Sequence, residues 1–214
     1  MSMEEAFQTA RSFSMVTHAD PRCVVACCIS VGLIRGILRG EIKNEDHVTD
    51  LCNVAFDWVE EQNRQSPDME TADFDKTEFT CHVSVDSFKG LILDSKMTQG
   101  YVYKALGAAV LSLRQVIQRC PAGVNTAESD AAKAFEDIIT KLVMEGGDAD
   151  TNACIAGALV GTWLGYQGLP THWRDGMLNR EWLEGKVQDM CRILGVVEGE
   201  YKAGEDKDTH PEGV

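Results

Sequence analysis

The segment Glu145-Gly146-Gly147-Asp148-Ala149-Asp150-Thr151-Asn152 joins two stretches of apolar, helical character and decides how the rest of the sequence is interpreted. Residues 128–144 carry apolar side chains at three- and four-residue intervals, and residues 152–165 form an apolar stretch rich in small residues. Gly146 and Gly147 permit backbone angles and close approaches that a Cβ atom would hinder. The segment therefore predicts a glycine turn that leads into a packed helix.

The same periodicity continues on both sides of this turn. It predicts further helices over residues 4–16, 24–38, 44–63, from Gly100 to about residue 120, and over 182–194. Asp20-Pro21 supplies a cap and a first-turn proline for the second of these helices. About seven helices with little strand predict an all-α chain that forms a compact helical domain rather than a solenoid.

Two stretches do not follow this pattern. The periodicity fails from residue 65 to about residue 96, which therefore receives no predicted element. Residues 198–214 are charged and contain Gly204, Pro211 and Gly213, which predicts a disordered tail. The predicted organisation is one domain over residues 1–197, followed by this tail.

The charge balance excludes several classes of partner. The chain has 20 basic and 34 acidic residues, for a net charge of −14. Such a surface repels nucleic-acid backbones and anionic lipid, so we expect no nucleic-acid partner. No apolar run reaches about 18 residues without a charge, so we also expect no membrane span. A phosphate-bearing small molecule remains compatible, because a divalent cation can invert the potential of an acidic pocket.

The eight cysteines are not arranged as a metal site, since no CxxC pair occurs. The first residues lack the basic and apolar regions of a signal peptide. We therefore expect reduced thiols and an intracellular, cytoplasmic protein.

Three side chains at the glycine turn could bind a metal ion. Asp148, Asp150 and Thr151 offer hard oxygen donors, which suit magnesium, manganese or calcium better than zinc. The same residue types are also ordinary helix caps, and acids at a helix start complement the helix dipole. Spacing alone favours the capping interpretation.

The segment from Glu145 to Ala153 looks like the Gly-Gly-Asp-x-Asp-Thr signature of the ADP-ribosylglycohydrolase family. The resemblance extends, in the same order along the chain, to residues 17–22, 38–40, 100–102, 155–161, 169–170, 173–174 and 179–183. It covers most of residues 4–190 and is weakest from 62 to 95.

The resemblance implies an orthogonal helical bundle with two magnesium ions, for which manganese could substitute. It implies hydrolysis of the N- or O-glycosidic bond between ADP-ribose and an acceptor, with ADP-ribose or an ADP-ribosylated protein as the partner. By the same resemblance the metal ligands are Asp148, Asp150 and Thr151, and the substrate-binding residues are His18, Gly100, Tyr101 and Gly147. Considered without the resemblance, His18 is as well explained by local hydrogen bonding and Tyr101 by core packing.

One part of the family pattern is missing. Members carry, before the Thr-His segment, a Gly-Asp stretch and a Thr-Asp-Asp motif that supply the opposing metal ligands and an acidic catalytic residue. Neither occurs in this sequence, so the resemblance implies an N-terminally truncated bundle with half a metal site and no assigned catalytic residue.

Three functional hypotheses follow. The first is an ADP-ribosyl hydrolase, and the second is a non-catalytic truncated relative that serves as a helical scaffold or a weak ADP-ribose- or metal-binding module. The third is a plain helical interaction domain. Apolar surface left uncovered by the truncation would also favour self-association.

Overall fold

The computed structural model describes residues 1–65 and 74–202. Contacts divide the chain into two compact units, Met1–Pro170 and Thr171–Val214, and the second is described as far as residue 202. All regular structure in the described ranges is helical, which confirms the all-α prediction. A single domain over residues 1–197 stays a prediction. Most of the predicted tail, residues 203–214, lies outside the described residues.

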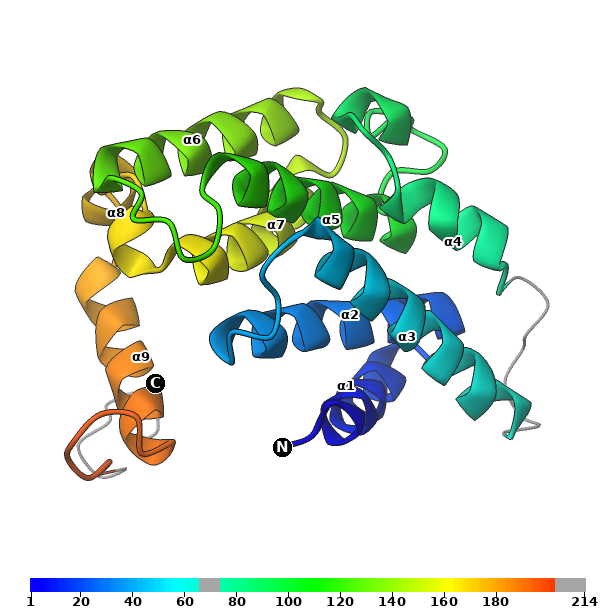
Figure 1. Cartoon of the computed structure of the whole chain (residues 1–214), viewed down its shortest axis with the longest axis horizontal. Helices are drawn as coiled ribbons and strands as arrows, with labels where there is room; N and C mark the ends of the chain where they lie inside the picture. Colours follow the sequence, from blue (N-terminus) through cyan, green and yellow to red (C-terminus); the bar gives the residue numbers. More distant parts are fainter. Residues whose placement is uncertain (66–73, 203–214) are drawn as a thin grey trace. The chain divides into compact units, whose positions relative to one another are not determined.

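The described part of the first unit contains α-helices and two short 3-10 helices (Figure 1). The α-helices are α1 (Met3–Thr17), α2 (Pro21–Leu38), α3 (Glu45–Arg64), α4 (Lys76–Val83), α5 (Val102–Arg119), α6 (Glu128–Met144) and α7 (Ala149–Leu164). The 3-10 helices are η1 (Phe88–Leu91) and η2 (Tyr166–Gly168). Every helix that periodicity predicted before residue 170 is present, and α7 begins at Ala149 rather than at Asn152.

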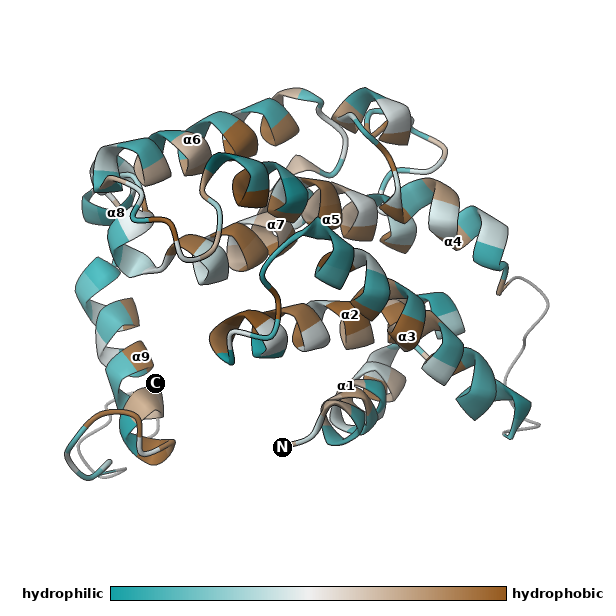
Figure 2. Ribbon diagram, viewed as in Figure 1, coloured by the Kyte–Doolittle hydropathy of each residue, from teal (hydrophilic) through white to brown (hydrophobic). Residues whose placement is uncertain are grey.

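α5 is the central helix of this unit. It packs against α2, α3, α4, α6 and α7, and lies among them in Figure 1. It is buried along most of its length, including the polar residues Lys104 and Ser112. Figure 2 shows apolar positions along α2 and α7, the two long helices that contact both α5 and each other. The core therefore forms where these three apolar helices meet.

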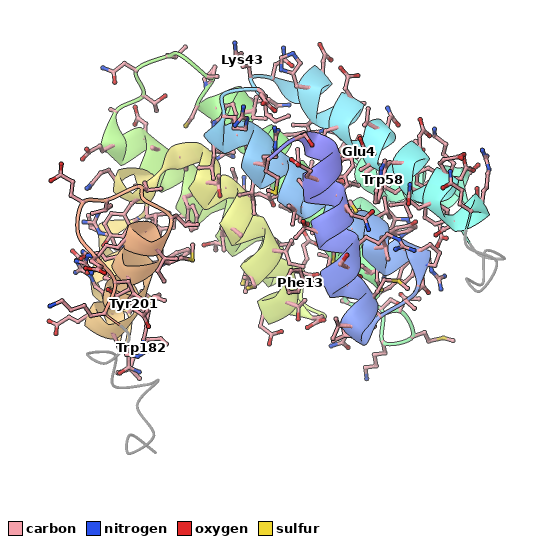
Figure 3. The ribbon with its side chains drawn as sticks, turned by 90° about the horizontal axis from the view of Figure 1, so that it is seen from below. Glu4, Phe13, Lys43, Trp58, Trp182 and Tyr201 are labelled. Atoms are coloured by element: carbon pink, nitrogen blue, oxygen red, sulfur yellow. The ribbon has the colours of Figure 1, made fainter. Side chains whose placement is uncertain are left out.

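α1 covers one side of this core. The helix, which carries Glu4 and Phe13 in Figure 3, packs on α2. The ring of Phe7 lies 5.6 Å from that of Trp58 on α3. Phe13, which belongs to the predicted apolar face of this helix, is 75% exposed. Burial therefore extends over only part of the face that the sequence pattern predicts.

Local sequence explains where several helices begin. Ser2 forms a capping box with Glu5 at the start of α1. Asp20 accepts a hydrogen bond from the Arg22 amide, and Pro21 occupies the first turn of α2, as predicted. Asn44 caps α3 in the same way. These side chains satisfy backbone amides that would otherwise lack partners.

The stretch that received no prediction contains α4 and η1. α4 has only eight residues, so its apolar repeat is too short to be recognised from periodicity. Phe79 of α4 and Leu91 of η1 are buried against the core, and their burial stabilises these short elements. Residues 66–73 lie outside the described part of the chain.

By length and composition, α2 is long and apolar enough to cross a membrane. Half of that helix is buried within the first unit, where it packs against α1, α3, α5 and α7. It also carries Arg22 and Arg35. These contacts are those of a core helix in a helical bundle.

The described part of the second unit contains α8 (Thr171–Asp175) and α9 (Arg180–Ile193), neither of which has a buried residue. Leu183, Val187 and Met190 are exposed at helical spacing along α9. Trp173 and Trp182 are 38% and 56% exposed.

Alanine substitution should have opposite effects on stability at two helical glycines, Gly107 of α5, which packs closely against α4 and η1, and Gly157 of α7, which has room for a Cβ atom. A Cβ atom at Gly107 would lie 2.5 Å from the His82 carbonyl oxygen and 2.9 Å from Leu91, whereas at Gly157 the nearest atom, on Phe135, is 3.9 Å away. Gly107→Ala should cost roughly 1–3 kcal/mol through overpacking. Gly157→Ala should gain up to about 1 kcal/mol, because alanine favours helix.

Urea unfolding followed by circular dichroism measures both changes. Equal effects of the two substitutions would contradict the close approach at Gly107.

Candidate metal- and ligand-binding site at the helix N-termini

The turn between α6 and α7 depends on its two glycines. Gly146 and Gly147 have φ angles of 74° and 70°, in the left-handed region that favours glycine. A Cβ atom at Gly147 would lie 1.9 Å from the Leu93 carbonyl oxygen, so the backbone itself packs against residues 93–94. The close approach that the sequence predicts for this glycine pair is therefore present at Gly147, whose predicted contact with substrate stays a prediction.

The turn presents two carboxylates at the start of α7. Asp148 is the residue before the helix, yet its side chain makes no capping hydrogen bond. Asp150 and Thr151 are exposed. The pKa of the Asp150 carboxyl is lowered mainly by a hydrogen bond from the Thr151 amide and, to a smaller extent, by a hydrogen bond with the Asp148 side chain. Capping, which spacing alone favoured, therefore does not explain Asp148, and the two carboxylates lie together.

Gly100 lies beside this carboxylate pair. A Cβ atom at Gly100 would be 3.6 Å from Asp148 Oδ2, and the φ angle of Gly100 is 78°. The structure therefore brings together Gly100 and Asp148, two residues that the sequence singled out separately.

A buried lysine supports the loop that leads to Gly100. Lys104 is 8% exposed, and its ammonium group donates to the Ile92 carbonyl and, at 2.6 Å, to Thr98 Oγ1. Ile92 itself has a φ of 48°, unusual for a β-branched residue. The sequence interpretation missed Lys104, although a lysine within the apolar pattern of α5 is a recognisable signal.

Tyr101 connects three helices and is only half-buried. Its hydroxyl donates to Glu78 Oε1 at 2.8 Å, and the Arg22 guanidinium lies 5.8 Å from the ring centre. Arg22 in turn pairs with Asp20 at 2.6 Å, which holds the pKa of Asp20 below its usual range. Burial, followed by the hydrogen bond to Glu78, raises the pKa of Tyr101 to about 12.

His18 lies at the end of α1 and is exposed, with Nδ1 3.0 Å from Thr17 Oγ1. It lines an apolar groove of about 460 Å³ together with Cys23 of α2, Val102 of α5 and Cys154 of α7. Cys23 and Val102 belong to the first turns of their helices and Cys154 to the second turn of α7, and Figure 1 shows the three helices beginning at the same end of the first unit.

This arrangement suits an anionic ligand with a cation. Helix N-termini favour negative charge, while the aspartates favour a hard divalent ion. Within the described residues, no group of three His, Cys, Asp or Glu side chains is placed to hold a metal. Asp148, Asp150 and Thr151 are thus suitable donors for part of a magnesium shell, with water filling the remainder.

The sequence profile of the ADP-ribosylglycohydrolase family matches residues 1–203. The chain belongs to the ADP-ribosylglycohydrolase family.

Individual relatives of this ADP-ribosylglycohydrolase chain are distant or match short segments. ADP-ribosylhydrolase ARH3 of Xenopus tropicalis is 24% identical over 200 residues, which cover 89% of this chain and 56% of the frog protein. A protein of Acanthamoeba polyphaga mimivirus that bears the name ADP-ribosyl glycohydrolase L543 is 49% identical over 45 residues. That match covers 21% of this chain and 13% of the viral protein.

An uncharacterized protein of Archaeoglobus fulgidus is 44% identical over 54 residues, 25% of this chain and 17% of that protein. No solved structure matches the chain significantly. The chain therefore spans little more than half the length of the frog relative and less of the other two.

The glycine turn of this family member predicts a strong effect of one methyl group. Gly147→Ala combines a left-handed backbone with a clash against the Leu93 carbonyl, so it should cost roughly 3 kcal/mol or more. Gly40→Ala is the matched control, because φ there is +67° but no described atom lies within 4 Å of the added Cβ. It should cost only about 1–2 kcal/mol.

Urea unfolding of both variants measures the difference. Equal losses would show that the approach of Gly147 to Leu93 carries no energetic weight.

The raised pKa of Tyr101 gives a separate prediction. The phenol should titrate near 12 instead of 10.0. Because the folded-state value is the higher one, its contribution to stability is fully present below pH 10 and is lost as the pH rises toward 12. Glu78→Gln removes the neighbouring charge, so the pKa of Tyr101 should fall but remain above its ordinary value.

Tyrosine ring ¹³C NMR, assigned with Tyr101→Phe, measures this titration. An ordinary pKa in the unaltered chain would contradict the packing around Tyr101.

Proposed function

We propose that this chain supplies the ADP-ribose-binding side and one set of metal ligands of an ADP-ribosyl-acceptor hydrolase. The main observation is the carboxylate of Asp148, which makes no capping hydrogen bond to α7. It lies next to Asp150 and faces Gly100, where α5 and α7 begin. Family membership supports ADP-ribose as the ligand.

In this proposal Asp148, Asp150 and Thr151 bind magnesium, or manganese in its place. The bound ions would polarise ribose oxygens and offset pyrophosphate charge next to the bond that water cleaves. The absence of a side chain at Gly100 leaves room beside Asp148 Oδ2 for a ligand oxygen. No described residue is assigned as the catalytic acid.

Tyr101 and His18 would contact the nucleotide part of the ligand. Tyr101 is held by Glu78 and Arg22, so its ring is positioned before a ligand binds. His18 lines the apolar groove, and because its Nδ1 lies 3.0 Å from Thr17 Oγ1, Nε2 is the ring nitrogen that would face a ribose or phosphate oxygen. Their proposed role is binding and orientation rather than proton transfer.

A second candidate is a non-catalytic relative that binds ADP-ribose or metal weakly. The donor set favours it, because the two carboxylates of Asp148 and Asp150 and the hydroxyl of Thr151 would leave most of an octahedral magnesium shell to water and hold the ion weakly. A plain helical interaction domain, the third hypothesis, requires that neither ligand bind. Self-association through exposed apolar surface, such as the groove beside His18, is proposed for the first two alike.

Calorimetric titration of ADP-ribose, with and without magnesium, tests the proposal. Magnesium should strengthen binding, and Asp148→Ala or Asp150→Ala should weaken it on the order of tenfold or more, the loss that altered metal surroundings commonly cause. Asp46→Ala is the matched control, because Asp46 is an exposed acid in the first turn of α3 and should leave binding unchanged.

Release of ADP-ribose from a modified protein, measured in parallel, separates the first two candidates. Binding without release supports the non-catalytic relative. No binding under any condition contradicts both.

A further inference from the structure

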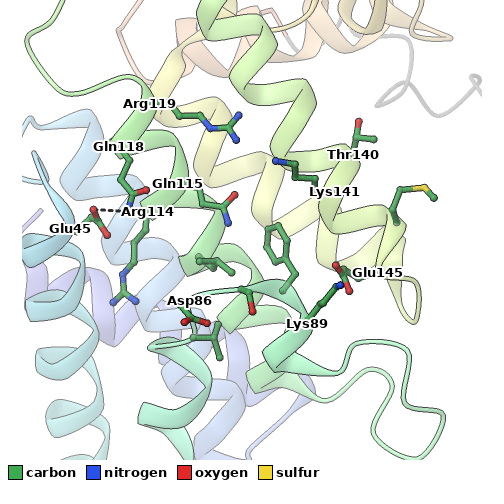
Figure 4. A pocket seen from close by; sticks show the side chains of 15 residues that line it. Glu45, Asp86, Lys89, Arg114, Gln115, Gln118, Arg119, Thr140, Lys141 and Glu145 are labelled. Atoms are coloured by element: carbon green, nitrogen blue, oxygen red, sulfur yellow. Dashed lines mark hydrogen bonds between the residues drawn. The ribbon is translucent and has the colours of Figure 1, made fainter.

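A cleft of about 800 Å³, lined by both charged and apolar side chains, lies between α5, α6, η1 and the start of α3 (Figure 4). None of the residues predicted for the ADP-ribose site lines it. We propose that this cleft is a second ligand site, which binds a phosphate-bearing small molecule of mononucleotide size.

The charge of the cleft differs in sign from that of the chain. Four basic side chains line it against three acidic ones, whereas the whole chain has 20 basic and 34 acidic residues. The basic residues are Lys89, Arg114, Arg119 and Lys141, and the acidic residues are Glu45, Asp86 and Glu145. A cationic cleft on an acidic protein focuses small anions, while the surrounding charge repels long polyanions such as nucleic acid.

Arg114 is fixed in place before any ligand arrives. Its Nη1 donates to the Val83 carbonyl at 2.7 Å and its Nη2 to Thr49 Oγ1 at 3.1 Å. A guanidinium has five N–H donors, so three remain for a ligand. A half-buried, preorganised arginine loses little conformational freedom when it binds phosphate oxygens.

Two further cations converge across the gap between α5 and α6. Figure 4 shows Arg119 and Lys141 pointing toward one another. Arg119 pairs with Asp137 at 3.3 Å, whereas the ammonium groups of Lys141 and Lys89 make no hydrogen bond or ion pair with a described residue. A phosphate between these cations would relieve their repulsion and provide the partner that both lysines lack.

The floor of the cleft is apolar. Leu111 and Phe88 are 5% and 6% exposed, and the amide side chains of Gln115 and Gln118 also line the cleft. Gln118 Nε2 donates to Glu45 Oε1 at 3.0 Å, which leaves further amide and carboxylate groups for a polar ring edge. An apolar floor with convergent polar groups is typical of ligand sites, and the volume lies within their usual range. A base over the floor with phosphate at the cations fits this pattern.

The cleft also adjoins the glycine turn. Met144 and Glu145 line it and directly precede Gly146, so a ligand in the cleft would contact the end of α6 that supports Asp148. The second site is nevertheless separable from the first, because its cations lie outside the turn.

Titration of ADP in EDTA into the chain carrying Asp148→Ala and Asp150→Ala tests the second site without metal binding at the turn. We expect saturable binding at one site. Adding Lys89→Glu and Lys141→Glu should weaken it at least about tenfold, because two phosphate contacts become repulsive. Lys133→Glu is the control for reversing one lysine charge outside the cleft, since Lys133 is exposed on α6, and it should change affinity less than about twofold.

Circular dichroism melting of each variant checks that the fold is retained. Absence of ADP binding, binding that the two cleft substitutions leave unchanged, or an equal loss in Lys133→Glu would each overturn the proposal. Because these titrations omit magnesium and both aspartates, their outcome is independent of magnesium-dependent ADP-ribose binding.

Discussion

The close approach of Gly147 to the Leu93 carbonyl is the contact on which the candidate site depends. It brings the turn between α6 and α7 against the loop that leads to α5, so that Asp148 lies beside Gly100. Lys104 holds the other side of the same loop through the Ile92 carbonyl and Thr98. Gly100, Gly147 and the buried Lys104 therefore determine where the carboxylate of Asp148 lies.

The long helices could be predicted from sequence because each has several turns of apolar repeat. Ser2, Asp20 and Asn44 are also standard capping residues, and all three accept the expected amide hydrogen bond. α4 could not be predicted, because eight residues give too few repeats and its stability comes from burying Phe79.

The sequence singled out most residues of the candidate site but not their contacts. The signature around Asp148 pointed to a metal turn, and the resemblance added Gly100 and Tyr101. That Tyr101 is held by Glu78, 23 positions away, and by Arg22 follows only from tertiary packing. Residue spacing likewise does not reveal that the Asp148 side chain makes no capping hydrogen bond. Whether the aspartates bind magnesium stays a prediction.

The way in which three separate helix starts meet also has a consequence for folding. Arg22, Tyr101 and Asp148 belong to chain segments far apart in sequence, and each is positioned by partners from another segment. Closing such long loops costs entropy that local contacts do not repay, so the site gains its geometry only when the core around α5 has formed. Local opening of this end of the unit would accordingly disperse all of its ligand groups together, and amide hydrogens of the first turns of α2, α5 and α7 should exchange as one cooperative unit.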